Sequence, residues 1–272
     1  VLSLPFYLRE LAQAVADELA IVSVQLPGLA EGERPIDTLE AQAEYVVAEL
    51  HRAGLRPPYL LGGHSFGGLV AIEVARRLRE AGEAVALLML GDTVRTRSDF
   101  SELQTDELAY TAMTRGLYAL YGRLTKLPYA ALAGLPAAKK FNRAARQMQQ
   151  EGLFGALELP LERMAAVFKA NFRAIGGYRP GPIAGDLALV RTAGGFPAEL
   201  LEYESGESLD DPGLGWSELV EGRLEIRTMP GDHLSMLDPA HLPSMAGILR
   251  ELVRDGLARY RREAAAAGEP AR

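Results

Sequence analysis

The sequence contains no cysteine, and this absence excludes several chemistries at once. A disulfide framework, a thiolate nucleophile and a Cys-ligated zinc or iron–sulfur site all need thiol groups. Long apolar runs are also missing, because no stretch approaches the roughly 18–20 consecutive apolar residues of a membrane helix. The N-terminus VLSLPFYLRE lacks the basic lead-in and the small-residue cleavage site of a secretion signal. These absences predict a protein that is neither secreted nor bound to a membrane.

Positive charge is scarce. The chain has 29 Lys and Arg against 36 Asp and Glu, which gives a net charge of −7. Nucleic-acid binding depends on clustered Lys and Arg that neutralise phosphates, so we expect no nucleic-acid partner. The lysines are confined to residues 126–169, where arginines join them. This locally basic stretch is either a solvated helical face or a contact for an acidic partner.

The length of 272 residues and the 48% hydrophobic content are ample for one large globular domain. Arginine far outnumbers lysine and alanine is abundant, which is typical of a GC-rich bacterial genome. With the absence of a secretion signal, this composition predicts a location in the bacterial cytoplasm.

Short apolar runs alternate with amphipathic helical patterns along most of the chain. Continuous apolar runs of this kind are buried on both faces in a parallel sheet. The sequence therefore predicts an α/β fold with a mostly parallel sheet flanked by helices. The expected strands are AIVSVQ, YLLGG, AVALLML at 84–90, DLALVRT at 186–192 and LEIRTMP at 224–230, and a last helix is expected over about 240–257.

Residues 94–181 show no strand pattern, and their sequence has helical patterns with irregular breaks. The sheet must be completed from both sides of this block, which favours a single domain over residues 1–272. We expect a core of residues 1–93 and 182–257 and a helical lid over 94–181. The sequence of the remaining residues, 258–272, predicts a fraying helix end.

The sharpest motif is GGHSFGG at residues 62–68, a G-x-S-x-G match between an expected strand and an expected helix. A serine nucleophile on such a tight turn needs small neighbours, and Gly63 and Gly67 meet that need. Gly68 lets the following helix pack closely. The turn also directs the backbone N–H of Phe66 toward the reacting carbonyl, where it can stabilise an oxyanion. Ser65 is therefore the expected nucleophile.

A serine hydroxyl needs a base that removes its proton. His233 lies in PGDHLSML, in a loop after the last expected strand, at the edge where a parallel sheet collects its catalytic groups. His64 adjoins the serine but should point away from it, and His51 sits near the exposed end of a helix. We expect His233 to be the base and His51, His64 and His241 to be structural.

The third member of such a site is a carboxylate that orients the imidazole. Asp92 follows the apolar strand at 84–90, directly beside the expected nucleophile strand, and is the favoured acid. Asp232 adjoins His233 and is better placed to brace the loop. The competing carboxylates follow DLALVRT and are Glu199, Glu202, Asp210 and Asp211.

Several segments resemble the integrated thioesterase domains that end modular nonribosomal peptide and polyketide synthases. They are GGHSFGGLVAIEVARRL, ALLMLGDT, YRPGPIAGDLALVRT, GWSELVEGRLEI and PGDHLSMLDPAHLPSMAGIL. The resemblance implies an α/β-hydrolase fold with a helical lid and the triad Ser65, Asp92 and His233. It also implies oxyanion donors at Phe66 and at about Val1. Near Val1 the sequence LSLP stands in place of the family's small Gly-rich turn, and the family's first strand would precede Val1.

The resemblance further implies the substrate and the partner. An acyl or peptidyl chain arrives as a thioester on the phosphopantetheine arm of a carrier domain, and the thioesterase itself holds no cofactor. Water then releases a free acid, or an internal nucleophile gives a macrocycle. The alternatives are a stand-alone editing thioesterase, a carboxylesterase and a non-catalytic α/β-hydrolase-like binding protein.

Apolar side chains of the expected lid have two interpretations: an apolar chamber that folds the acyl chain, or ordinary helix packing. They are Tyr110, Met113, Leu117, Tyr118, Tyr121, Met148, Phe154, Met164, Phe168 and Phe172.

Overall fold

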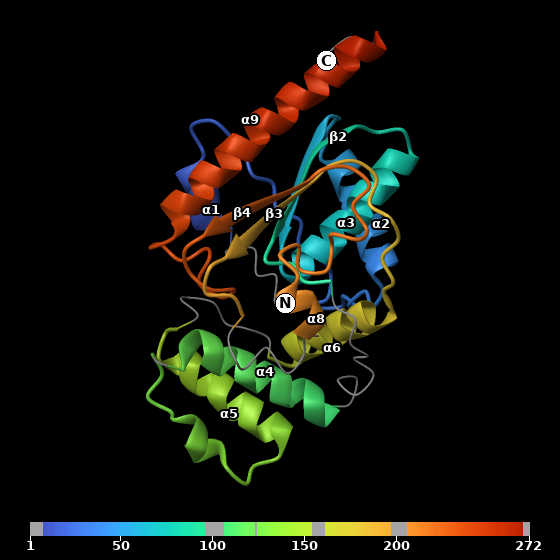
Figure 1. The fold of residues 1–272 in the computed structure, drawn as a ribbon. Coiled ribbons are helices and arrows are strands. Elements are labelled where there is room, and N and C mark those ends of the chain that lie inside the picture. The colour runs from blue at the N-terminus through green and yellow to red at the C-terminus, as the bar shows by residue number, and fades with distance from the viewer. Residues whose placement is uncertain (1–7, 96–105, 123, 154–160, 197–205, 269–272) are drawn as a thin grey trace.

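The computed structural model describes the chain except residues 1–7, 96–105, 123, 154–160, 197–205 and 269–272. A four-stranded sheet in the order β1-β2-β3-β4 forms its centre, and all neighbouring strands are parallel (Figure 1). The strands are β1 (Tyr59–His64), β2 (Val85–Gly91), β3 (Leu187–Thr192) and β4 (Leu224–Met229). Because every strand runs the same way, their carboxyl ends meet at one edge.

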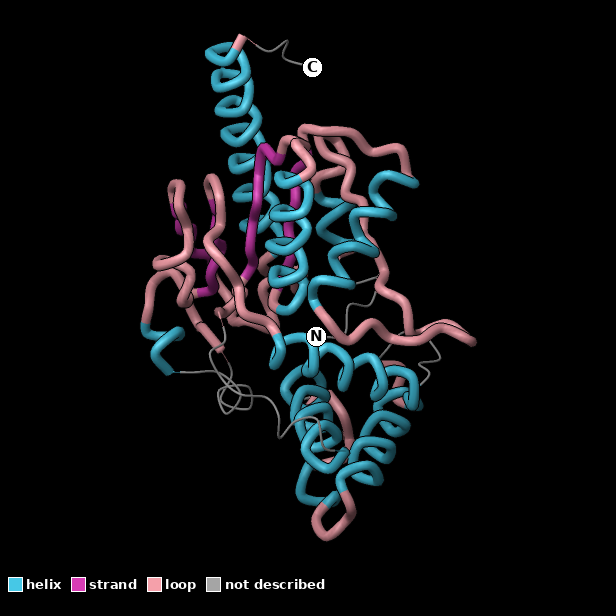
Figure 2. The backbone as a smooth tube through the Cα atoms, turned by 90° about the vertical axis from the view of Figure 1, so that its right-hand side faces the viewer, coloured by secondary structure: helices cyan, strands magenta, loops and turns pink. Residues whose placement is uncertain are grey.

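Helices cover both faces of this sheet (Figures 1 and 2). On one face lie α2 (Leu39–Arg52) and α3 (Phe66–Glu80), and on the other α1 (Arg9–Ala14) and α9 (Leu242–Ala267). Strand β2 shows how the burial divides: Leu88 and Leu90 belong to the apolar cluster under α2 and α3, whereas Leu87 and Met89 belong to the cluster under α1 and α9. Alternate side chains thus enter opposite layers, which explains the uninterrupted apolar run.

A second group of helices lies beyond the carboxyl ends of the strands (Figures 1 and 2). This helical block consists of α4 (Asp106–Tyr121), the short 3-10 helix η2 (Tyr129–Leu132), α5 (Ala137–Gln150) and α6 (Leu161–Gly177). It occupies the region expected to be helical, and α4 packs against both α5 and α6. A short helix, α8 (Gly206–Asp210), lies between β3 and β4 in the chain.

Two expectations about secondary structure were wrong. Residues 20–25 were expected to be a strand, but they form no strand, because no ladder hydrogen bond among the described residues reaches them. A β-branched composition favours a strand only where a neighbouring strand can pair with it. The final helix does not end near residue 257: α9 continues to Ala267 and ends at Gly268, whose φ of 75° gives a left-handed C-cap.

The parallel sheet flanked by helices confirms the fold class predicted from the sequence. Within the described ranges, every helix is too short or too polar to cross a bilayer.

Candidate active site

Ser65 lies on the turn between β1 and α3, in a backbone conformation that side chains rarely adopt, with φ 54° and ψ −124°. The turn is tight enough that a Cβ atom at Gly63 would collide with the backbone carbonyl of Gly67. The Ser65 N–H donates to the carbonyl of Gly91, the last residue of β2, over 2.9 Å. A glycine at position 63 and a bond to the neighbouring strand therefore hold the serine in its strained conformation.

The glycines that follow the serine are not equivalent. A Cβ at Gly67 would meet nothing within 4 Å, so the expectation that this position also needs a glycine was wrong. A Cβ at Gly68 would collide with the hydroxyl of Thr93, which itself donates to the Ser65 carbonyl over 3.0 Å. Gly68 thus permits the close approach between α3 and the end of β2.

His233 lies in the loop after β4, and its Nε2 is 3.1 Å from the Ser65 Oγ. The side chain is almost fully buried, with 6% of its surface exposed. Burial lowers the pKa of His233 below the ordinary 6.5, and the nearby Asp92 carboxylate opposes that shift. A neutral imidazole within hydrogen-bond distance of a serine hydroxyl can accept its proton.

Asp92 directly follows β2 and has a left-handed backbone, with φ 39°. Its carboxylate is buried and lies on the far side of the imidazole from Ser65, with Oδ2 3.7 Å from His233 Nδ1. That separation allows an ion pair but is longer than a hydrogen bond. Two shorter contacts hold the carboxylate: Thr192 donates its N–H to Oδ1 over 2.8 Å and its hydroxyl to Oδ2 over 2.5 Å.

Two aromatic rings contact the His233 imidazole. The ring of Phe196 stacks on it with centroids 4.2 Å apart and an interplanar angle of 27°. The ring of His64 lies 4.8 Å away, so this residue is closer to the site than the sequence suggested. Burial lowers the pKa of His64 well below its ordinary value and the neighbouring His233 adds to that effect, which leaves His64 neutral.

The remaining histidines lie apart from the serine. His51 pairs with Glu83 over 2.9 Å on the surface, and His241 is the residue that precedes α9, where its side chain makes no capping hydrogen bond. Asp232 accepts hydrogen bonds from Leu234 and Ser235 and so braces the histidine loop.

The competing carboxylates do not supply an acid in the described part of the chain. Asp211 accepts from the N–H groups of Gly213 and Gly215 and braces its own turn. Glu199 and Glu202 lie outside the described residues, and Asp210 is exposed at the end of α8.

One of the two expected oxyanion donors lies in the described structure. Phe66 is the first residue of α3, where the helix provides no acceptor for the backbone N–H. This N–H directly follows the nucleophile in the chain, the usual position of an oxyanion donor on such a turn. Val1 lies outside the described residues.

Burial favours ordinary helix packing for five of the apolar side chains in the helical block. Met113, Leu117, Met148, Phe168 and Phe172 are each at most 7% exposed and belong to the apolar cluster on the α2–α3 side of the sheet. They therefore pack inside the protein, as ordinary helix packing requires. Phe154 lies outside the described residues.

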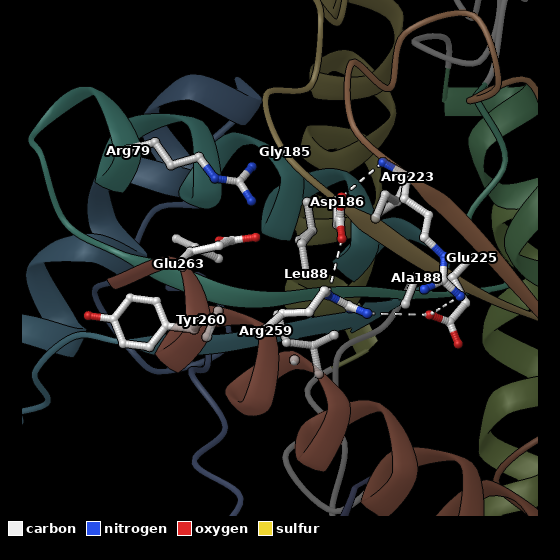
Figure 3. A pocket seen from close by; sticks show the side chains of 15 residues that line it. Arg79, Leu88, Gly185, Asp186, Ala188, Arg223, Glu225, Arg259, Tyr260 and Glu263 are labelled. Atoms are coloured by element: carbon white, nitrogen blue, oxygen red, sulfur yellow. Dashed lines mark hydrogen bonds and ion pairs between the residues drawn. The ribbon is translucent and has the colours of Figure 1, made fainter. Parts of the chain in front are cut away.

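A cavity of about 250 Å³ lies at the opposite edge of the sheet, where β2, β3 and β4 begin (Figure 3). Several of its charged side chains pair with one another: Arg259 with Asp186 over 3.2 Å, and Arg223 with Glu225 over 3.0 Å. Arg259 also lies 3.9 Å from Glu225, so it connects α9 to the starts of both β3 and β4. The cavity is lined by neither Ser65 nor His233, so it is separate from the candidate active site.

Sequence reasoning missed Thr192 and Phe196. Thr192 is the last residue of β3, which neighbours β2, so the rule that carboxyl ends of parallel strands meet could have indicated its contact with Asp92. No pattern in the sequence marks Phe196, because its contact with His233 joins two loops.

A Ser–His–Asp arrangement with a buried acid and base at the carboxyl edge of a parallel sheet, and with the serine on a strained strand-to-helix turn, defines an α/β-hydrolase. Known proteins specify the class further. The sequence pattern of the thioesterase domain family matches residues 6–252, and the chain belongs to this family of hydrolases that act on thioesters.

Two of the similar proteins are synthases much longer than this chain. The chain is 27% identical over 264 residues to the non-reducing polyketide synthase men2 of Menisporopsis theobromae, which aligns 93% of this chain with 12% of the relative. It is 25% identical over 241 residues to CymA of Salinispora arenicola, a probable non-canonical nonribosomal peptide synthetase, covering 88% of this chain and 3% of the relative. The chain thus spans a small fraction of these relatives.

Solved structures show the same fold. A four-domain nonribosomal peptide synthetase bound to AMP and glycine superposes with a TM-score of 0.71 at 25% identity, covering 90% of this chain and 18% of that one. The Vlm2 thioesterase domain bound with a dodecadepsipeptide superposes with a TM-score of 0.62 at 20% identity, covering 90% and 88%. These matches confirm the α/β-hydrolase fold, and the family match confirms the resemblance seen in the sequence.

Proposed function

We propose that this thioesterase domain transfers an acyl or peptidyl chain from a carrier-bound thioester onto Ser65 and then releases it. In this proposal His233 is the general base, Asp92 orients and stabilises the imidazole, and the Phe66 N–H stabilises the oxyanion, with Val1 as the expected second donor. The distance of 3.1 Å between Ser65 Oγ and His233 Nε2 carries the proposal, because it allows direct proton transfer.

The first half of the reaction forms an acyl-enzyme. The Ser65 hydroxyl proton passes to His233 Nε2 while Oγ attacks the thioester carbonyl, and the carbonyl oxygen becomes an oxyanion. The carbon–sulfur bond then breaks, and the leaving sulfur takes the proton from the imidazolium. The products are an ester on Ser65 and a free pantetheine thiol, so no cofactor bound to this domain is used.

The second half reverses the roles. A nucleophile gives its proton to His233 and attacks the ester carbonyl, and Ser65 regains its proton when the ester bond breaks. Water as the nucleophile gives a free acid, whereas a hydroxyl or amine of the same acyl chain gives a macrocycle. In either case Asp92 compensates the positive charge on the imidazolium.

We propose that the partner is a carrier domain of the same synthase. The relatives with this domain are a polyketide synthase and a nonribosomal peptide synthetase, of which this chain matches 12% and 3%. Helix α5 offers a contact for an acidic surface, since it contains Lys139, Lys140, Arg143 and Arg146 and no acidic residue. The relatives include bacterial and fungal proteins, so a bacterial cytoplasmic origin stays a prediction from composition.

Intact mass spectrometry tests the acyl-enzyme. The wild type, Ser65→Ala and the matched control Ser217→Ala are each incubated with a fluorophosphonate and with an acyl pantetheine thioester. Ser217 is exposed and lies on a different loop, so its variant should gain the same adduct as the wild type. An adduct on Ser65→Ala, or none on the wild type, would contradict the assignment of the nucleophile.

Product analysis in the same reactions separates the two modes of release. A product lighter by one water than the free acid indicates cyclisation, and the free acid itself indicates hydrolysis.

A charge reversal tests the carrier contact. Lys139→Glu with Lys140→Glu should slow turnover of a carrier-bound substrate but not of a free pantetheine thioester. The matched control reverses Arg261 and Arg262 on α9, far from the helical block (Figure 1). Equal turnover of the carrier-bound substrate by both double variants would exclude α5 as the contact.

A further inference from the structure

One short segment contacts both the acid and the base of the candidate site. It runs from Thr192, the last residue of β3, to Phe196, and is called here the β3 turn. The β3 turn approaches the histidine loop closely: the Gly194 N–H donates to the Gly231 carbonyl over 2.8 Å. A Cβ at Gly194 would lie 2.7 Å from that oxygen, so the approach depends on a glycine.

At its start the β3 turn holds the acid. Thr192 donates its backbone N–H to Asp92 Oδ1 over 2.8 Å and its hydroxyl to Oδ2 over 2.5 Å. The two side chains are each about 2% exposed, so water does not compete for these oxygens. Both carboxylate oxygens are thereby fixed, including the one that faces His233.

At its end the β3 turn holds the base. The Gly195 carbonyl accepts the backbone N–H of His233 over 2.8 Å, which fixes the position of the histidine loop. The Phe196 ring then stacks on the imidazole at 4.2 Å, which fixes the plane of the ring. The two contacts restrain backbone and side chain together.

We propose that the β3 turn is a positioning element for the reaction, in which the Thr192 hydroxyl orients the Asp92 carboxylate and the Phe196 ring orients the His233 imidazole. This inference rests on the proposed roles of Ser65, His233 and Asp92.

Each contact has a physical reason to act on the reaction. The 3.7 Å between Asp92 Oδ2 and His233 Nδ1 must shorten when the imidazole becomes a cation, and a carboxylate free to rotate would lose that alignment. The face of the Phe196 ring carries partial negative charge, so it attracts the imidazolium that forms as Ser65 loses its proton. Neither residue exchanges a proton or touches the reacting carbonyl in this account.

The Thr192 hydroxyl is tested by the kinetics of fluorophosphonate labelling, which report the serine attack and separate its maximal rate from the inhibitor's affinity. Thr192→Val keeps the shape and the backbone N–H but removes the hydroxyl, and it should lower the maximal labelling rate about tenfold with unchanged affinity. Thr192→Ser restores the hydroxyl and should recover most of the rate. Thr228→Val, at an exposed position on β4, is the matched control and should label like the wild type.

The Phe196 ring is tested in the same assay. Phe196→Leu keeps an apolar side chain but removes the ring, and it should lower the maximal rate about threefold to fivefold. Phe196→Tyr keeps the ring and should recover the rate. Thermal unfolding of every variant shows whether the change in rate comes from a loss of folded protein.

The outcomes separate this inference from the proposed function. If the wild type is not labelled, both the proposed function and the positioning role of the β3 turn are wrong. If the wild type is labelled and Thr192→Val and Phe196→Leu react as fast as Thr228→Val, only the positioning role falls. A Thr192→Ser variant as slow as a folded Thr192→Val would also overturn it, because the hydroxyl would then not be the group that matters. Should Thr192→Val not fold, Phe196→Leu and Phe196→Tyr decide the question by the same comparison.

Discussion

The nucleophile turn and the acid–base pair reach the same edge of the sheet by different means. The turn is determined locally, since Gly63, Ser65 and Gly68 lie within six residues and its tight geometry follows from them. The acid–base pair joins segments far apart in the chain: Asp92 after β2, the β3 turn, and His233 after β4. One part can be recognised as a motif, whereas the other exists only once the sheet has formed.

The two parts are therefore sensitive to different kinds of substitution. A local turn is vulnerable to a single steric change, because a misplaced atom meets backbone that cannot move away. An assembly of distant segments is vulnerable to the loss of a charge or a hydrogen bond that joins them. Substitutions that change one part at a time therefore separate these two kinds of failure.

The largest effect is expected at the acid. Asp92→Asn removes the negative charge and places an amide NH₂ against one of the two Thr192 donors. We expect the acylation rate to fall by about 10³–10⁴-fold, since the imidazolium loses its counter-charge and its orientation. Stopped-flow or quench measurement with an acyl pantetheine thioester gives this rate.

The matched control for the acid is Asp210→Asn, at the exposed carboxylate that ends α8 after β3. It should react like the wild type. A larger loss in Asp210→Asn than in Asp92→Asn would move the acid to the segment after β3.

The next effect is expected at the nucleophile turn. A Cβ at Gly63 would collide with the Gly67 carbonyl, so Gly63→Ala should lower the free energy of unfolding by roughly 3 kcal/mol and abolish labelling of Ser65. Gly67→Ala adds its Cβ where nothing lies within 4 Å and should change stability by less than about 1 kcal/mol. Urea unfolding of the two variants measures the contrast, and equal losses would show that the turn constrains both glycines alike.

These glycines also show the limit of sequence reasoning. The motif predicted the strand, the turn and the helix correctly, because a tight strand-to-helix connection requires small residues in a fixed order. It could not tell Gly63 from Gly67, since the distinction depends on the direction of a Cβ that glycine lacks. The prediction of a strand at residues 20–25 was wrong for a related reason: a strand needs a partner strand, and composition does not reveal one.

The acid–base pair was harder to predict. The position of His233 after an expected strand suggested its place at the carboxyl edge, and the structure brings it within 3.1 Å of Ser65 Oγ. The contacts that hold it, from Gly195 and Phe196, join two loops and leave no periodic pattern. Periodicity records burial, so it identified the strands and helices but not the loop residues that orient the side chains between them.

A smaller effect tests the connection between the two regions. Thr93 donates its hydroxyl to the Ser65 carbonyl, and its own backbone carbonyl accepts the indole N–H of the fully buried Trp216 over 2.7 Å. Trp216→Phe leaves the backbone carbonyl of Thr93 without its indole donor and should lower the free energy of unfolding by about 1–3 kcal/mol, with less than about a threefold loss of labelling rate. Urea unfolding followed by circular dichroism measures it, because Trp216 is the sole tryptophan. A loss of labelling without a loss of stability would instead assign Trp216 a direct role in the reaction.

The smallest expected effect is a shift in the midpoint of the pH dependence of the labelling rate. The direction of this shift depends on two opposing effects on the pKa of His233. Burial lowers the pKa of His233 below 6.5, while Asp92 raises it, and burial is the larger cause. The neutral imidazole is the active base, so the labelling rate should fall as pH falls through that lowered pKa, and at pH 6.5 it should still exceed half of its plateau. Labelling rates across about pH 5–8 measure the midpoint. A midpoint above 6.5 would mean that Asp92 outweighs burial, which requires its carboxylate to approach Nδ1 more closely than 3.7 Å in solution.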